Sequence, residues 1–159
     1  MITRPPAGSP RIYHFPNFVR HTLANGLGVW FVPLPERELV SVHLLTDAGA
    51  ATEDESDAGV AALTAQLLVT GTRDLDAAAF AETTERLGIE GGSESAWDSA
   101  RAGFVALGTH LDAGLELLAD MVVAPRLAEH EFDRLKAERL NEILQVRSGP
   151  GRLSHACFL

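Results

Sequence analysis

The order of strand-like and helix-like segments is the feature that most constrains the fold of this chain. Asn25-Gly26 is a strong signal for a hairpin turn between two β-rich segments. The strand-like segments are Val19–Leu23, Leu27–Pro33, Leu39–Leu45, Ile89–Ala96 and Ser99–Leu107, and the last two are joined near Trp97-Asp98. Three of these segments precede the first helical pattern, and two lie between helical patterns.

Four helices complete the pattern. They are expected over Ala58–Val69, Asp76–Leu87, His110–Val123 and Glu129–Arg147. Asp57 is a suitable N-cap for the first helix and Gly71 follows its end, while Gly88 stops the second. Strands and helices in this order favour an α+β fold, a two-layer sandwich in which helices cover one face of a largely antiparallel sheet.

Composition restricts the partners that this chain can take. Its 159 residues are 46% apolar, which is enough to bury one core and suggests a single domain. The formal charge of -9 disfavours nucleic acid as a partner, because nucleic acids are bound through basic patches. The single cysteine, Cys157, excludes an internal disulfide and provides no cysteine-based metal site.

The N-terminal residues carry no targeting signal that we recognise. No stretch approaches the roughly 20 apolar residues of a membrane span, and residues 1–17 lack the apolar core of a signal peptide. We therefore expect a cytoplasmic protein without membrane contacts. Residues 1–17 contain four prolines and are expected to form an extended N-terminal arm that precedes a domain over residues 18–159.

The most informative motif is Gly59–Thr72, with the sequence GVAALTAQLLVTGT. It resembles the first-domain motif of the M16 (pitrilysin, insulinase and processing-peptidase) metallopeptidases, which runs G-x-A-H-x-x-E-H and ends in G-T. In this alignment the two metal histidines fall on Ala62 and Gln66, and the glutamate base falls on Ala65. Alanine offers no lone pair for Zn²⁺ and no proton to move, and a glutamine amide is at best a weak oxygen ligand.

Other segments match the same family in order, over about residues 18–155. They are His21–Pro33, Val40–Ala50, Glu53 with Gly59, Leu87-Gly88, Gly91–Ser93, Leu117–Asp120 and Pro125. The resemblance implies the N-terminal domain of an M16 protein, that is, a LuxS/M16-metallopeptidase-like half. The missing motif residues leave this expectation for the fold unchanged and argue against peptidase activity.

A new apolar pattern begins after Pro150 and continues to Leu159. In the family that the chain resembles, this region continues into another helix and then into a second homologous domain. We therefore expect the domain over residues 18–159 to be truncated at its C-terminal end.

The resemblance implies one remaining metal ligand, a glutamate on the last long helix, and Glu142 is the best match. The alternative is that Glu142 is an ordinary solvated or ion-paired helix carboxylate. A single carboxylate cannot hold zinc, since a catalytic site needs about three protein ligands. No two of the six histidines are spaced i, i+3 or i+4. We therefore predict no catalytic residues and no bound cofactor, although catalytic relatives use zinc.

The segment Gly91–Trp97 resembles an edge strand on which M16 substrates are bound as an added β-strand. On this basis Ser95, Ala96 and Trp97 are candidate substrate-binding residues. The alternative is that Trp97 packs in the core and that the strand is internal.

Three functions follow from these observations. The resemblance favours a non-catalytic M16 subunit or half that serves as scaffold and chamber wall for a peptide, beside an M16 partner that carries zinc. The second possibility is an active zinc endopeptidase whose metal site lies elsewhere. The third is a stand-alone peptide-binding or assembly domain. A neighbouring reading frame with an intact His-x-x-Glu-His motif would favour the first over the third.

Overall fold

The chain divides into two units, residues 1–37 and residues 38–159. A computed structural model describes residue 8 and residues 12–151. In the first unit, β1 (Val19–Thr22) and β2 (Gly28–Phe31) form an antiparallel hairpin. Most of the expected N-terminal arm and the apolar pattern after residue 152 lie outside the described residues.

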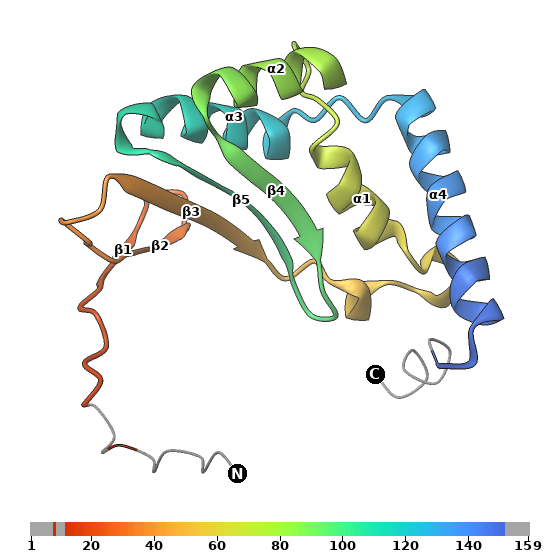
Figure 1. Ribbon diagram of the computed structural model, residues 1–159, viewed down its shortest axis with the longest axis horizontal. Coiled ribbons are helices and arrows are strands. Elements are labelled where there is room, and N and C mark those ends of the chain that lie inside the picture. Colours follow the sequence, from red (N-terminus) through yellow and green to blue (C-terminus); the bar gives the residue numbers. More distant parts are fainter. Residues whose placement is uncertain (1–7, 9–11, 152–159) are drawn as a thin grey trace, which may run out of the picture. The chain divides into compact units, whose positions relative to one another are not determined.

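The second unit is built on a three-stranded antiparallel sheet. Its strands are β3 (Leu39–Thr46), β4 (Glu90–Ser95) and β5 (Ala100–Leu107). Their order is β3-β5-β4, so that β5 is central in the described part of the chain and β4 forms one edge (Figure 1). The sequence predicted the β4–β5 pair and its turn near Trp97-Asp98, and this prediction is confirmed.

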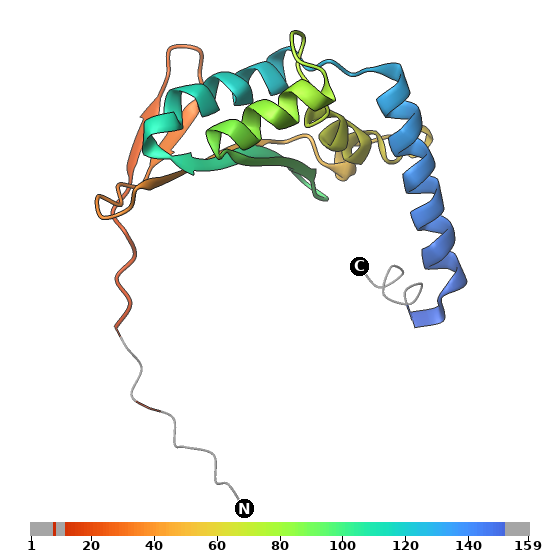
Figure 2. The same ribbon diagram turned by 45° about the horizontal axis from the view of Figure 1, so that its top comes forward.

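The described part of this unit contains four α-helices. They are α1 (Val60–Leu68), α2 (Ala77–Leu87), α3 (Leu111–Val123) and α4 (Glu129–Ser148). Of these, α1, α2 and α3 contact the sheet and α4 contacts α1. Helices α2 and α3 lie on one face of the sheet (Figure 2). The core beneath them is centred on Ile89, Phe104 and Ala106, each at most 7% exposed. The expected α+β two-layer fold is confirmed.

The loop after α1 is tied to the link between α3 and α4. Thr72 is only 2% exposed and forms an isolated antiparallel bridge with Pro125. The amide of Arg73 donates to the carbonyl of Ala124 (2.8 Å), and the amide of Arg126 donates to the carbonyl of Gly71 (3.1 Å). These backbone bonds hold the start of α4 near the end of α1, and the two helices are in contact.

The start of α1 differs from the sequence prediction. Asp57 does not cap this helix, because it lies in a short 3-10 turn over Glu55–Asp57. The residue before the helix is Gly59, whose φ of 102° is in the left-handed region that favours glycine. The side chain of Glu53 supplies the cap instead. It accepts hydrogen bonds from the amides of Gly59 (2.8 Å) and Ala61 (2.5 Å).

The ends of α2 agree with the prediction. The Asp76 carboxylate accepts a hydrogen bond from the amide of Ala79 (2.9 Å), and Gly88 ends the helix with a φ of 60°. Among the described residues, no helix combines the length and the apolar character that crossing a bilayer requires.

Candidate functional site

The helix α1 carries the three motif positions, of which two would hold zinc and one would carry the glutamate base in a catalytic relative. Ala65 is 4% exposed and faces the protein interior, whereas Ala62 is half-buried and Gln66 is exposed. Zinc in catalytic sites is bound by about three imidazole, carboxylate or thiolate groups. Two methyl groups and one amide do not provide this donor set, so the residues on α1 do not fit a catalytic zinc ion.

Glu142 lies on α4 and is exposed. Its carboxylate accepts a hydrogen bond from Arg139 on the same helix at 2.9 Å. Within residue 8 and residues 12–151, no group of three or more His, Cys, Asp or Glu side chains is placed to hold a metal ion. A role for Glu142 as a remnant of a metal site therefore stays a prediction.

The N-terminus of α1 is held by a carboxylate. The hydrogen bonds from the amides of Gly59 and Ala61 stabilise the charged form of Glu53, and they lower the pKa of its carboxyl group. The partial positive charge at the start of a helix acts in the same direction. Glu53 thus fixes the first turn of the helix that carries the former metal positions.

This contact predicts a specific pH dependence. A carboxyl group with a lower pKa in the folded state than in the unfolded chain stabilises the fold fully above its unfolded value, near 4.5. The contribution is lost as the pH falls through the folded pKa. We expect Glu53→Gln to be less stable than the wild type at pH 7, and the difference to shrink below about pH 4.5.

Urea unfolding of both proteins between pH 3 and pH 7 measures this difference. Glu55→Gln is the control, because it removes a neighbouring exposed carboxylate without removing a helix cap. A Glu53→Gln difference that stays constant over the whole pH range would contradict the assigned role of this carboxylate.

The outer edge of β4 is the second part of the site. The amide of Ala96 donates to the carbonyl of Ser99 (2.8 Å), which fixes the alternation of the antiparallel ladder. It follows that the amides and carbonyls of Gly91, Ser93 and Ser95 point away from β5. In the described part of the chain these outward groups have no hydrogen-bond partner.

The three predicted substrate-binding residues lie at the end of this edge. Ser95 is the last residue of β4, and Ala96 and Trp97 begin the turn to β5. The carbonyls of Ala96 and Trp97 are already bonded. They accept hydrogen bonds from the amides of Ala50 (3.0 Å) and Ala51 (2.6 Å), respectively. Trp97 is 75% exposed, so the alternative that it packs in the core is wrong.

Sequence reasoning missed two features of this site. The open backbone groups lie mainly before the predicted triplet, at Gly91 and Ser93. The alternation of an antiparallel hairpin, counted back from the turn at Trp97-Asp98, could have identified them. The capping role of Glu53 was also missed, although the family pattern places a glutamate before the glycine that precedes the helix.

Comparisons with known proteins agree with these observations. The model of the insulinase family of peptidases (M16) matches residues 31–157. The non-peptidase homolog YmxG of Helicobacter pylori is 25% identical over 107 residues, which is 67% of this chain and 25% of that protein. A protein of Rickettsia felis described as an uncharacterized zinc protease is 25% identical over 142 residues, or 89% of this chain and 34% of that protein.

Solved structures show the same fold. The crystal structure of a peptidase M16 inactive domain from Pseudomonas fluorescens matches with a TM-score of 0.82 and 28% sequence identity. The match covers 87% of this chain and 34% of the chain in that structure. The crystal structure of a protease from Helicobacter pylori matches with a TM-score of 0.70 and 28% sequence identity. This match covers 79% of this chain and 31% of the chain in that structure. The chain thus spans about a quarter to a third of the relatives that it matches. It belongs to the insulinase (M16) family of peptidases, as a non-catalytic member in which alanine, alanine and glutamine occupy the motif positions.

Proposed function

We propose that the chain acts as the non-catalytic wall of a peptide-binding chamber, beside an M16 subunit or half that carries the intact zinc motif. The observation that carries this proposal is the combination of α1 without zinc ligands and β4 with an unpaired outer edge. In such a pair the zinc-bearing half cleaves the peptide, and this chain holds it.

The open edge of β4 suits a peptide of variable sequence. Gly91, Ser93 and Ser95 offer alternating amides and carbonyls, which an added strand can pair with through its own main chain. The strand carries no apolar side chain, since its six residues are Glu, Gly, Gly, Ser, Glu and Ser. Affinity would therefore come from backbone hydrogen bonds, with little selection for the side chains of the guest.

A proline substitution at Ser93 tests the peptide-binding part of the proposal. Ser93→Pro removes an outward amide but none of the β4–β5 hydrogen bonds, and proline is tolerated on an edge strand in that position. Ser93→Ala removes the same hydroxyl and keeps the amide, so it is the matched control. We expect Ser93→Pro to weaken binding of a fluorescent unstructured peptide about three- to tenfold, the loss of about one hydrogen bond.

Fluorescence anisotropy measures this binding, and circular dichroism checks that each variant is folded. Ser93→Ala should bind the peptide as the wild type does. Equal binding by the wild type and Ser93→Pro would contradict strand addition at β4. Cleavage of the peptide by the purified chain in the presence of zinc, detected by mass spectrometry, would contradict its role as a non-catalytic wall.

The pairing with a zinc-bearing half has its own experiment. The chain is co-expressed with an M16 polypeptide from the same organism that contains His-x-x-Glu-His. Co-elution in size-exclusion chromatography and faster peptide cleavage than by the zinc-bearing polypeptide alone support the pairing. If the two chains elute separately and cleavage is unchanged, the pairing is wrong.

A further inference from the structure

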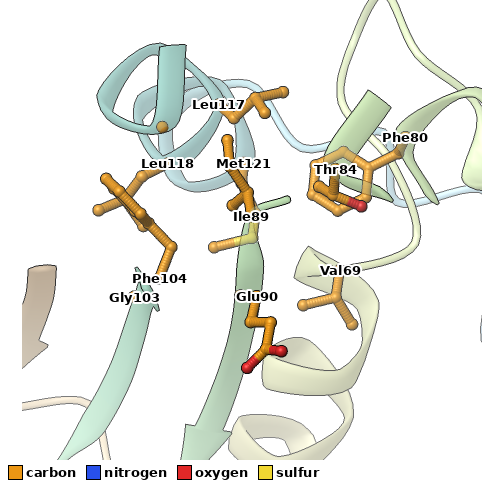
Figure 3. A pocket seen from close by; sticks show the side chains of 12 residues that line it. Val69, Phe80, Thr84, Ile89, Glu90, Gly103, Phe104, Leu117, Leu118 and Met121 are labelled. Carbon is orange, nitrogen blue, oxygen red and sulfur yellow. The ribbon is translucent and has the colours of Figure 1, made fainter. Parts of the chain in front are cut away.

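The two faces of the sheet carry different hollows. On the helix-covered face an apolar pocket of about 310 Å³ lies beside Phe104, under α2 and α3 (Figure 3). Its two polar side chains do not serve a ligand there. The hydroxyl of Thr84 already donates to the carbonyl of Ala81 (2.8 Å), and the carboxylate of Glu90 extends away from the apolar side chains. The polar groups that could select a ligand therefore belong to the opposite face.

A second hollow, of about 220 Å³, lies on that opposite face. Phe104 faces the helices and pairs with Gly91 on β4. Since successive side chains of a strand alternate between the two faces, the β4 residues on either side of Gly91 face the other way. At one of them, Gly92, an added Cβ would meet no atom within 4 Å, so the hollow is open above its backbone. Four ionisable side chains line this hollow, namely His43, Glu90, Glu94 and Arg101.

His43 forms a fixed wall of the second hollow. Its Nε2 lies 3.0 Å from the hydroxyl oxygen of Ser41. Its Nδ1 lies 2.7 Å from the position that a Cβ on Gly103 would take, so the imidazole ring occupies the space that a side chain there would fill. Gly103 pairs with Gly92 across β5 and β4. A flat group placed over Gly92 would therefore lie against this ring.

The charges in the hollow are unevenly compensated. At one end, Nη2 of Arg101 and Oε1 of Glu94 form an ion pair at 2.8 Å. Glu90 lies four residues before Glu94, or about 13 Å along the strand. Within the described part of the chain, its carboxylate forms no hydrogen bond and no ion pair. The hollow thus has one free carboxylate, at the end away from its arginine.

We propose that this second hollow binds a small molecule that carries a guanidinium group. A guanidinium is planar and weakly hydrated, so it can lie flat over Gly92 and against the ring of His43. Its fork of N–H donors matches the geometry of a carboxylate, which Glu90 supplies. These are side-chain interactions on a sheet face, so the inference does not rest on the addition of a peptide to the main chain of the β4 edge.

Three probes separate charge from shape. Phenylguanidine carries the planar cation, phenylurea is its neutral counterpart of nearly the same shape, and benzylamine carries a compact ammonium group. We expect phenylguanidine to bind with a dissociation constant of about 1–10 mM, as the small number of non-hydrogen atoms allows. It should bind about two- to fivefold more tightly than phenylurea, which is the usual size of an exposed ion pair. Benzylamine should bind more weakly than phenylguanidine, because it lacks the planar fork.

Amide NMR spectra of the purified chain locate the binding. Phenylguanidine should shift the amide resonances of Gly92 and Gly103 saturably. Gly92→Val fills the hollow without meeting another atom at its Cβ, and valine suits a strand, so this variant should fold and lose the shift at Gly103. Ser95→Val is the matched control. It adds the same side chain to the same strand, outside the lining, and should keep the shifts.

Glu90→Gln tests the charge preference without filling the hollow. This variant should bind phenylguanidine and phenylurea equally. Glu85→Gln, which removes an exposed carboxylate outside the lining, should keep the wild-type preference. An unchanged preference in Glu90→Gln would overturn the role of Glu90. An undiminished shift at Gly103 in folded Gly92→Val, or shifts confined to amides elsewhere, would overturn the site itself.

Discussion

Phe104→Ala is expected to lower the free energy of unfolding by about 3–5 kcal/mol, because it removes a buried aromatic ring and leaves a cavity. Phe104 is 4% exposed on the central strand β5 and packs with Ile89 and Ala106 under the helices. A domain of this kind is stabilised by about 5–15 kcal/mol in total. The substitution would therefore remove a large share of the stability, as urea unfolding followed by circular dichroism should show.

Phe15→Ala is the control for this measurement. Phe15 is 73% exposed, so truncation of its side chain should change the stability by about 0.5 kcal/mol or less. Similar losses for both variants would show that the ring of Phe104 is not part of a packed core.

Gly49→Ala has the second large expected effect. The backbone of Gly49 is extended (φ -93°, ψ 177°), so any residue could adopt its conformation. The available space is what requires glycine. An added Cβ would lie 2.4 Å from the amide nitrogen of Ser99 and 2.5 Å from the carbonyl oxygen of Trp97. We expect a loss near the upper end of the range of about 1–3 kcal/mol for overpacking, because backbone atoms cannot move aside as a side chain does.

This substitution also affects the candidate site. Gly49 precedes Ala50 and Ala51, whose amides donate to the carbonyls of Ala96 and Trp97 in the β4–β5 turn. Gly92→Ala is the matched control, since an added Cβ there would meet no atom within 4 Å. Urea unfolding of the two variants gives the comparison. Equal stability of Gly49→Ala and Gly92→Ala would mean that the turn lies further from Gly49 than described.

Local signals in the sequence predicted most of the secondary structure. Asn25-Gly26 forms a turn in which the Asn25 side chain accepts a hydrogen bond from the amide of Leu27 (3.1 Å). Asp76 and Gly88 mark the two ends of α2, as their residue types indicated. Each of these features is decided by residues that are close together in the chain, so the sequence contains the necessary information.

Features that depend on tertiary contacts were not predictable in the same way. Asp57 has the residue type of a helix cap, but Glu53, four residues earlier, accepts the hydrogen bonds from the amides of Gly59 and Ala61. The close approach of Gly49 to the β4–β5 turn joins segments nearly 50 residues apart (Gly49 and Trp97). The apolar pocket beside Phe104 depends on how α2 and α3 rest on the sheet.

In the candidate site too, residue types could be predicted from the sequence and features that depend on tertiary contacts could not. The absence of the two zinc histidines at Ala62 and Gln66 and of the glutamate base at Ala65 follows from residue identity alone, because alanine has no ligand atom and glutamine offers only a weak amide oxygen. Which backbone groups of the β4 edge remain open follows only from strand order and register. The absence of the motif residues could therefore be recognised from the sequence, whereas the open backbone groups of the β4 edge required the structure.

The composition of β4 also affects self-association. An unpaired strand edge is a template on which further copies of a chain can stack into aggregates. Such stacking requires apolar or aromatic side chains that interdigitate between strands. β4 has only glycine, serine and glutamate, so a second copy would bring carboxylates close together and would bury almost no apolar surface. An edge of this composition can stay open to a guest strand and still resist polymerisation with its own copies.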